Sequence, residues 1–337
     1  MAEKQARRGQ KVKLLYIIKI LTELTDEDHP LSATEICEKL AAYDITAERK
    51  AIYDDINCLI DFGYDIISTR VPKNGYFLAS RDFELPEVFL LGDAVRTAKF
   101  ISEKKTRELT SKLDRLLSKY QSKRNIQGIY IDSSNKTHNE ELFYNIDRIN
   151  TAIAEDKKIK FTYSKRVLRE GRQITTESKT RVVSPYAMTW QFDYYYLIGN
   201  YEKYNNLMNL RIDRIHSVEI LDEPIRHFSE VSDYRDTFDV ADYTKKLFGM
   251  FGGNMQEVKL RCSNKILEQV TDRFGDSIFI TNVTDATFDF TVKAAVSDAL
   301  VTWIMNYEDK IEVITPTELR DKIKNRAEQI LKIYKKS

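Results

Sequence analysis

The spacing of apolar residues near the amino terminus predicts two helices joined by a loop. In VKLLYIIKILTEL, apolar residues recur at helical spacing, which predicts a first helix of about three turns. The residues that set this spacing are Leu14, Leu15, Ile18 and Leu21. After a loop with His29 and Pro30, the segment SATEICEKL has Ser32 and Glu35 at the spacing of a capping box, which predicts a short second helix.

A third helix and a hairpin are expected next. The segment AERKAIYDDINCLIDFG can begin at Thr46 as an N-cap and end at Gly63. Its apolar stripe is formed by Ile52, Ile56 and Leu59, and its opposite face carries Arg49, Lys50, Tyr53 and Asn57. The alternating segment DIISTRVPKNGYFLA contains Asn74-Gly75, a strong hairpin signal, so a two-stranded wing should follow the third helix.

Three helices followed by a hairpin are the order of a winged helix-turn-helix, in which the third helix enters the major groove of DNA. Arginine can read guanine edges and asparagine can pair with adenine, while hydroxyl groups and lysine bind phosphates. The candidate DNA-binding residues are therefore Thr46, Arg49, Lys50, Tyr53, Asn57, Arg70 and Lys73. The alternative is that Arg49 and Lys50 form only a solvated helix face. The stretch ERKAIYDDINCLIDFGYDI, with its wing, also resembles the helix-turn-helix of a known group of regulators.

Charge limits this interpretation, because acidic residues slightly outnumber lysine and arginine in residues 1–80. The positive charges gather on the third helix, in the wing and in an amino-terminal arm, where they could neutralise individual phosphates. The arm residues are Lys4, Arg7, Arg8, Lys11 and Lys13. Asp54 stands where many relatives place arginine, which removes one phosphate contact. A homodimer that reads two half-sites would recover the affinity.

The segment from Phe83 to Tyr120 is expected to be helical throughout, with a stripe of apolar residues. This stripe contains Leu90, Val95, Leu109, Leu113 and Leu116. It could pack inside its own protomer or form a dimer contact. The next stretch, QSKRNIQGIYIDSSNKTHNEE, is expected to be a loop, and LFYNIDRINTAIAEDK a helix.

From Lys158 the period of the pattern changes to two, which predicts four or five short strands and a small SH3-like or Sm-like barrel. In QFDYYYLIGNYE, alternation places Tyr194 and Tyr196 on one face and Tyr195 on the other. We expect Tyr196 to pack in the core. LMNLRIDRIHSVEIL is expected to be one strand with Arg211 and Asp213 on the same face.

Two stretches of this region, SPYAMTWQFDYYYLIGNY and NLRIDRIHSVEIL, resemble a WYL domain. Tyr195, Tyr196 and Leu197 occupy the three positions that name the family, with tyrosine in place of tryptophan at the first. RVVSPY and LRIDRI fall where the family has its arginine before proline and its Arg-x-Asp-Arg segment. Together with the winged helix, the order resembles a WYL-family bacterial transcriptional regulator over nearly the whole chain. The carboxy-terminal strands and helices resemble the family's extension, an α+β domain of ferredoxin-like type.

The expected fold class is thus a multidomain α+β protein with five parts. They are a winged helix-turn-helix (1–80), a helical linker (81–156), a WYL β-barrel (157–225), an extended crossing linker (226–254) with Gly252-Gly253 as its joint, and a WYL carboxy-terminal extension (255–337).

The resemblance implies that the WYL domain senses a nucleic-acid or nucleotide ligand that modulates DNA binding. Arginine side chains bind phosphate or carboxylate with two hydrogen bonds, and aromatic rings can stack on bases. The candidate ligand-binding residues are Arg181, Ser184, Tyr186, Tyr195, Arg211, Asp213 and Arg214. The alternative is that Arg211 and Asp213 form a surface ion pair, which contributes only about 0–1 kcal/mol and has no function.

Composition argues against the other classes of protein. The 337 residues are 42% hydrophobic, enough for packed cores, and carry a net charge of +1. No catalytic motif is present, and the four histidines and three cysteines lack metal-ligand spacing, so we expect neither an enzyme nor a metal or cofactor. The absence of a membrane-spanning run and of a signal peptide favours the cytoplasm.

The sequence therefore predicts a ligand-responsive regulator that binds operator DNA as a homodimer. The alternative is an accessory nucleic-acid-binding protein of a phage-defence or RNA-guided system, which holds single strands on the barrel.

Overall fold

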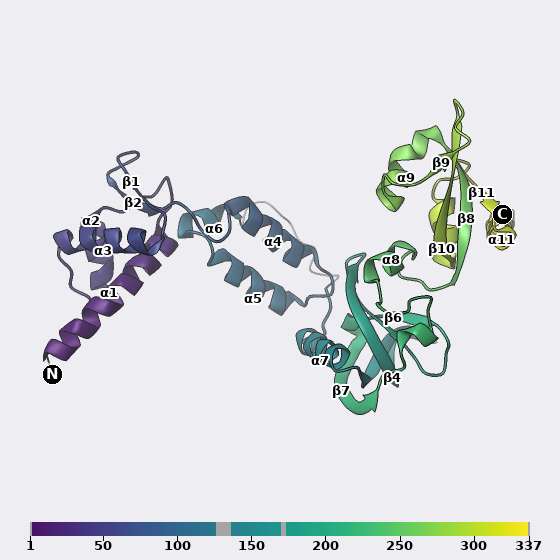
Figure 1. The fold of residues 1–337 in the computed structure, drawn as a ribbon, viewed down its shortest axis with the longest axis horizontal. Coiled ribbons are helices and arrows are strands. Elements are labelled where there is room, and N and C mark those ends of the chain that lie inside the picture. The colour runs from purple at the N-terminus through teal and green to yellow at the C-terminus, as the bar shows by residue number, and fades with distance from the viewer. Residues whose placement is uncertain (1, 126–135, 170–172, 336–337) are drawn as a thin grey trace. The chain divides into compact units, whose positions relative to one another are not determined.

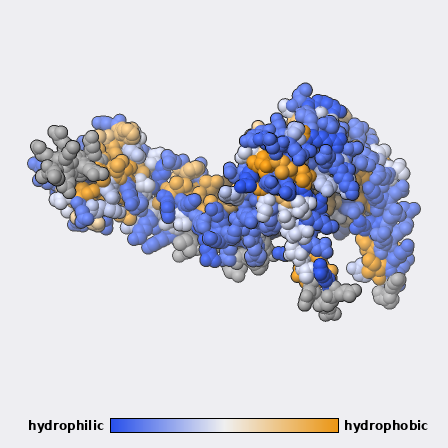
Figure 2. Space-filling view, turned by 90° about the horizontal axis from the view of Figure 1, so that it is seen from below, coloured by the Kyte–Doolittle hydropathy of each residue, from blue (hydrophilic) through white to orange (hydrophobic). Residues whose placement is uncertain are grey.

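A computed structural model describes residues 2–125, 136–169 and 173–335 of the chain. The fold is a mixture of helices and sheets, as expected, and its contacts divide it into two compact units, Met1–His138 and Asn139–Ser337. No helix in the described ranges is long and apolar enough to cross a membrane. Figure 2 shows a face on which hydrophilic residues predominate and hydrophobic surface is broken into separate patches.

The first unit begins with three helices and a hairpin, which lie together at the amino-terminal end of Figure 1. These elements are α1 (Ala2–Leu24), α2 (Ala33–Ala41), α3 (Arg49–Phe62), β1 (Ile66–Thr69) and β2 (Gly75–Leu78). Their shared core contains Ile17, Leu21, Ile36, Leu40, Ile52, Ile56, Leu59 and Leu78. The capping box of Ser32 and Glu35 is confirmed, because both of its hydrogen bonds form. Leu15 was expected to share the apolar face of the first helix, but it does not belong to this core, because its side chain is exposed.

Helix α3 starts later than expected. Its first residue is Arg49 and its N-cap position is held by Glu48, without a side-chain hydrogen bond, so Thr46 is not the cap. Thr46 lies instead in the exposed loop before the helix. At the other end, Gly63 closes the helix with φ 116°, a left-handed conformation that a residue with a Cβ rarely adopts.

The hairpin is present, but Gly75 has a different role from the one its sequence suggested. Thr69 pairs with Gly75, so the turn comprises residues 70–74 and Gly75 belongs to strand β2. A Cβ at this position would lie 2.8 Å from the carbonyl carbon of Leu31. Leu31 exchanges two backbone hydrogen bonds with Tyr76, at 2.9 and 2.8 Å. The glycine therefore allows the loop before α2 to pair with the hairpin.

The expected continuous helix after residue 82 is three helices. These are α4 (Leu85–Thr97), α5 (Glu103–Asp114) and α6 (Lys119–Asn125). The first break follows from an extended backbone at Ala98, after which Ser102 caps α5. Leu90 is 72% exposed, so the expected stripe is not a single buried face. The expected loop from Gln121 is helical up to Asn125, and its residues 126–135 lie outside the described ranges.

The expected helix LFYNIDRINTAIAEDK is present as α7 (Leu142–Ala154), but it belongs to the second unit and not to the linker. It is followed by an antiparallel sheet of five strands in the order β6-β5-β4-β3-β7. The strands are β3 (Lys157–Arg169), β4 (Gln173–Gln191), β5 (Tyr194–Asn200), β6 (Leu207–Arg211) and β7 (Ile215–Pro224). The expected single strand from Leu207 onward is interrupted by a 3-10 turn, η2 (Ile212–Arg214). Asp213 therefore lies on a turn and not on a strand.

The segment between the two sheets of this unit is packed, so the expectation of an extended linker is wrong. It forms the 3-10 turn η3 (Phe228–Glu230) and helix α8 (Val240–Lys245). Its side chains share a core with the face of strand β5 that carries Tyr196; this core includes Tyr186, Tyr196, Ile198, Val231, Tyr243, Leu247 and Met250. We call residues 226–253 the strap. At its end, a Cβ on Gly253 would lie 2.5 Å from the carbonyl oxygen of Val296, so the strap packs directly on the next domain.

The carboxy-terminal domain has the order strand, helix, strand, strand, helix, strand, helix. The elements are β8 (Asn254–Ser263), η4 (Asn264–Ile266), α9 (Leu267–Phe274), β9 (Ile280–Thr281), β10 (Thr287–Val296), α10 (Asp298–Met305), β11 (Ile311–Thr315) and α11 (Thr317–Tyr334). Its antiparallel sheet has the order β11-β8-β10-β9. This order is compatible with the ferredoxin-like assignment, which stays a prediction.

Candidate functional site

The solvent-facing side of helix α3 is the first candidate site. Ile52, Ile56 and Leu59 are buried, so the helix presents its other side to solvent. On that side Arg49, Lys50 and Asn57 are exposed. The Arg49 Nε donates a hydrogen bond to the Tyr53 hydroxyl at 2.8 Å, which holds the guanidinium beside the first turn of the helix. The positive charges thus lie at the amino-terminal end of the helix, while Asp54 and Asp61 lie further along the exposed side.

Two lysines that were predicted to bind DNA phosphates form ion pairs within the protein. Lys13, assigned to the basic arm, is buried, and its Nζ lies 2.7 Å from the Asp55 carboxylate on α3. It therefore joins two helices of the core. Lys73 of the hairpin is exposed but pairs with Glu35 at 2.5 Å. Arg70, the other predicted hairpin residue, is exposed, and the side chains of the remaining arm residues lie outside the description.

A cleft of the second unit, with a volume of about 1420 Å³, is the second candidate site. Its walls come from strands β3 to β6, the turn η2, the strap, and strands β8 and β10. Six cationic side chains line it: Lys165, Arg181, Arg211, Arg214, Lys246 and Lys293. One carboxylate, that of Asp233, belongs to the same lining. The cleft is therefore suited to an anion.

Half of these cations already have a carboxylate partner. Lys293 lies 3.0 Å from Asp233, Lys246 pairs with Asp242, and Arg211 pairs with Asp213. For Lys165, Arg181 and Arg214, no hydrogen bond or ion pair is found within the described part of the chain. These three side chains are available to a ligand.

Arg211 is held on two sides. Its Nε and Nη2 donate to the two oxygens of Asp213 at 3.0 and 2.7 Å. The guanidinium carbon lies 3.3 Å from the centre of the Tyr194 ring. Burial alone would lower the pKa of Arg211, but the hydrogen bonds and the charge of Asp213 outweigh it and raise that pKa. The pair is largely buried, with 9% of the Asp213 side chain exposed, so it is not the surface pair of the alternative interpretation.

Arg181 lies close to two aromatic rings. Its guanidinium carbon is 5.8 Å from the ring centre of Tyr163 and 5.6 Å from that of Tyr201. The Nε is buried and has no hydrogen-bond partner. A second, smaller cavity of about 230 Å³ adjoins Arg181 and is also lined by Lys165 and Lys179. Arg181 therefore stands where the two cavities meet, with an unused donor.

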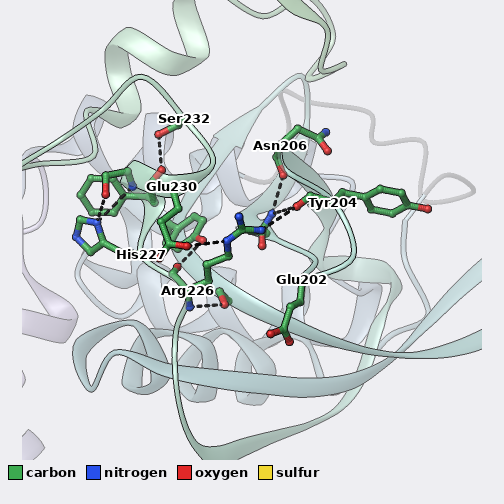
Figure 3. A network of polar contacts seen from close by, with 12 residues as sticks. Glu202, Tyr204, Asn206, Arg226, His227, Glu230 and Ser232 are labelled. Atoms are coloured by element: carbon green, nitrogen blue, oxygen red, sulfur yellow. Dashed lines mark hydrogen bonds and ion pairs between the residues drawn. The ribbon is translucent and has the colours of Figure 1, made fainter.

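Ser184 and Tyr186, predicted to bind the ligand, instead fasten the beginning of the strap. The Ser184 Oγ accepts a hydrogen bond from the Arg226 amide at 3.0 Å, and the Tyr186 hydroxyl donates to the Arg226 carbonyl at 2.6 Å. The Arg226 side chain reaches Glu230 and the Tyr204 carbonyl in the same network (Figure 3). Burial raises the pKa of Tyr186 to about 12. Neither residue lines the cleft.

Tyr195 is also absent from the cleft lining, because it lies on the face of strand β5 opposite to Tyr196. Tyr196 is buried in the core, as expected, and its edge reaches the cleft. The aromatic partner of Arg211 is Tyr194, which sequence reasoning missed. Strand alternation carried the signal, since Tyr194 and Tyr196 share a face and Tyr196 pairs with Arg211.

No group of three histidine, cysteine or acidic side chains that could hold a metal ion occurs among the described residues.

Comparisons with known proteins assign the two sheets of the second unit to two different domain families. Residues 144–220 match the WYL domain family, and residues 254–331 match the WCX domain family. The chain therefore contains a WYL domain, which includes most of helix α7, followed by a WCX domain. No curated protein matches the chain significantly.

One similar solved structure is the proteasome accessory factor B/C (PafBC) of Arthrobacter aurescens. The likeness has a TM-score of 0.28 and 15% sequence identity, and it covers 92% of this chain and 47% of the other. The chain thus spans about half the length of that protein.

Proposed function

We propose that this protein is a DNA-binding transcriptional regulator whose WYL domain senses an anionic ligand, namely a nucleic acid or a nucleotide. In this proposal residues 1–80 form a winged helix-turn-helix, and the helical linker, expected to reach residue 156, ends before the WYL domain begins at residue 144. The WYL domain binds the ligand, and the WCX domain forms one wall of its cleft. The protein binds its operator as a homodimer, because one copy presents few free cations to DNA.

The observation that carries the proposal is the exposed amino-terminal turn of α3, with Arg49 and Lys50 facing solvent and an apolar stripe packed behind them. A recognition helix contacts base edges mainly through its amino-terminal residues. The unpaired backbone N–H groups at this end also favour a phosphate. Thr46 and Asn57 lie on exposed positions on either side of this turn along the chain.

The ligand half of the proposal is supported by the charge of the cleft. Three of its cations lack a hydrogen-bond or ion-pair partner in the described structure, and Arg181 lies within 6 Å of two tyrosine rings. Guanidinium groups bind phosphate with two hydrogen bonds, and tyrosine rings offer stacking surface to bases. The cleft is large enough for more than one nucleotide, because typical small-molecule pockets hold about 300–1,000 Å³.

The test is selection of bound duplexes from genomic fragments, followed by affinity measurements on the selected duplex. We expect the double variant Arg49→Ala/Lys50→Ala to bind this duplex about tenfold more weakly or worse, since each base contact contributes about 1–3 kcal/mol. The control variant Lys104→Ala/Lys112→Ala removes the same charge from exposed positions of α5 and should bind normally.

Equal affinity of the Arg49→Ala/Lys50→Ala variant and the parent would overturn the assignment of α3. Failure to select any duplex, together with binding to single strands, would instead favour an accessory nucleic-acid-binding protein.

A further inference from the structure

The carboxylate of Asp213 binds the guanidinium of Arg211 in the way that an anionic ligand would. It accepts hydrogen bonds from Nε and Nη2, the two-donor geometry with which arginine binds phosphate or carboxylate. Arg211 lines the cleft, whereas Asp213 approaches it from the turn η2. An anionic ligand that reaches Arg211 must therefore compete with a carboxylate of the protein itself.

The turn that carries Asp213 is fastened to the beginning of the second unit. The Asn139 Nδ2 donates to the carbonyls of Asp213 and Ile215, at 3.1 and 2.8 Å. The Asn145 Nδ2 donates to the same Ile215 carbonyl at 2.8 Å. Both asparagines are buried, with 7% and 2% of their surface exposed. Buried amides of this kind keep their partners, because an unsatisfied one is costly.

One further contact joins the same two segments. The Glu141 carboxylate accepts a hydrogen bond from the Ser217 amide at 2.9 Å, and the Asn139 Oδ1 accepts one from the Glu141 amide at 2.9 Å. Residues 213–217 and residues 139–145 are thus connected by a continuous set of hydrogen bonds. Asn139 follows directly on His138, the last residue of the unit that contains α3.

We propose that Asp213 is an internal competitor of the ligand, and that its displacement from Arg211 is the step that transmits ligand binding to residues 139–145. The inference deepens the proposed function and depends on it. Ligand binding moves Arg211 from Asp213 to the ligand. The turn η2 then loses the ion pair that holds its side chain, and the hydrogen bonds between this turn and residues 139–145 adjust.

The competition between Asp213 and the ligand for Arg211 also determines which class of ligand can displace Asp213. Displaced Asp213 is a largely buried carboxylate without its partner, which costs free energy. A ligand must regain that free energy from the free cations Lys165, Arg181 and Arg214. A single phosphate reaches fewer of these side chains than a ligand with several phosphates, so the cleft selects polyanions. The two states of the turn are the one in which Asp213 pairs with Arg211 and the one in which Asp213 is displaced. A ligand shifts the equilibrium between them only by its differential affinity for the two states, and the competition with Asp213 supplies that difference.

The test compares Asp213→Asn with the parent protein, using fluorescence anisotropy of a labelled single-stranded oligothymidylate as the anionic probe. The variant keeps the size of the side chain but removes the competing charge, so we expect it to bind the probe about fivefold more tightly or better. The control Glu219→Gln changes the net charge equally on the same sheet, where Glu219 pairs with Lys160 outside the cleft. It should change the affinity by less than about twofold.

A second measurement on the parent protein makes the test independent of how the variant folds. Addition of the probe should alter hydrogen exchange at the Ser217 and Glu141 amides, which form the connecting hydrogen bonds. Equal affinity of the parent and Asp213→Asn would overturn the competition, and unchanged exchange at both amides would overturn the transmission. Absence of probe binding to both proteins would refute the ligand half of the proposed function, and this inference with it.

Discussion

The Arg181 side chain has a buried hydrogen-bond donor, its Nε, without an acceptor. The Nε makes no hydrogen bond, and the guanidinium lies within 6 Å of the rings of Tyr163 and Tyr201. An unsatisfied buried donor costs about 1–3 kcal/mol, while a cation–π contact returns about 0.5–1 kcal/mol. Such a side chain lowers stability unless a ligand pairs with it. Functional sites are where proteins accept a cost of this kind.

We therefore predict that Arg181→Met separates stability from ligand binding. Methionine has a similar reach and can pack against the two rings, so thermal unfolding should occur at the same temperature or higher. Affinity for the oligothymidylate probe should fall about tenfold or more, because hydrogen bonds to charged groups contribute about 1.5–3 kcal/mol. Calorimetry and anisotropy measure the two effects.

The matched control is Arg166→Met, an exposed position on the neighbouring strand β3, on the other face of the sheet. It should leave the probe affinity nearly unchanged. A destabilised Arg181→Met variant with normal affinity would show that Arg181 is a structural residue.

At the scale of elements, Lys73 and Glu35 connect the hairpin to helix α2. Glu35 accepts hydrogen bonds from Lys73 at 2.5 Å and from the Ser32 amide at 2.8 Å, so one carboxylate belongs to the capping box and also holds the hairpin. The hydrogen bond from Lys73 is the main cause that lowers the pKa of Glu35 to about 2. Under the proposed function, a DNA phosphate at the hairpin would have to compete with Glu35 for Lys73.

The lowered pKa has a defined consequence for stability. A carboxyl group with a pKa of about 2 in the folded state and 4.5 when unfolded stabilises the fold fully above pH 4.5. That contribution is lost as the pH falls from 4.5 to about 2. Because the side chain is one-third exposed, solvent screening limits the contribution to about 1 kcal/mol.

We predict that Lys73→Met raises the pKa of Glu35 back toward 4.5, whereas Lys39→Met, an exposed lysine on α2, does not. Carboxyl chemical shifts of the full chain, titrated by NMR from pH 2 to 6, measure this directly. An unchanged Glu35 titration in Lys73→Met would mean that this ion pair does not connect the hairpin to α2 in solution.

The elements also show what sequence patterns can and cannot predict. Local signals were reliable where the cause is local, as in the capping box at Ser32 and the end of α3 at Gly63. They failed at Thr46, which is not the cap of α3, and where the cause lies far along the chain. The close approach of Leu31 to Gly75 and of Val296 to Gly253 leaves no trace near either glycine in the sequence.

The candidate cleft shows the same limit. Arg181, Arg211 and Arg214 were predicted to belong together, and all three line the cleft. Lys246 and Lys293 were missed because the strap was expected to be extended, so its helix and the adjoining strand β10 were not expected beside the WYL sheet. Ser184 and Tyr186 were misassigned for the same reason, since their partner Arg226 begins the strap.

At the scale of the whole molecule, the net charge of +1 gives no general attraction to nucleic acid. Under the proposed function, affinity must come from local groups: the first turn of α3 for duplex DNA and the cleft cations for the ligand. The first group lies in the unit Met1–His138 and the second in the unit Asn139–Ser337. Regulation then requires that an event in one unit changes the affinity of the other, and coupling of this kind is typically about 1–3 kcal/mol.

The measurement that tests this account most directly is the affinity of the parent protein for its selected duplex at physiological salt, without and with a saturating concentration of the oligothymidylate. The account predicts that the oligonucleotide changes the dissociation constant by about 5–150-fold, and that the duplex changes the affinity for the oligonucleotide by the same factor. An identical duplex affinity with and without the saturating oligonucleotide would contradict it.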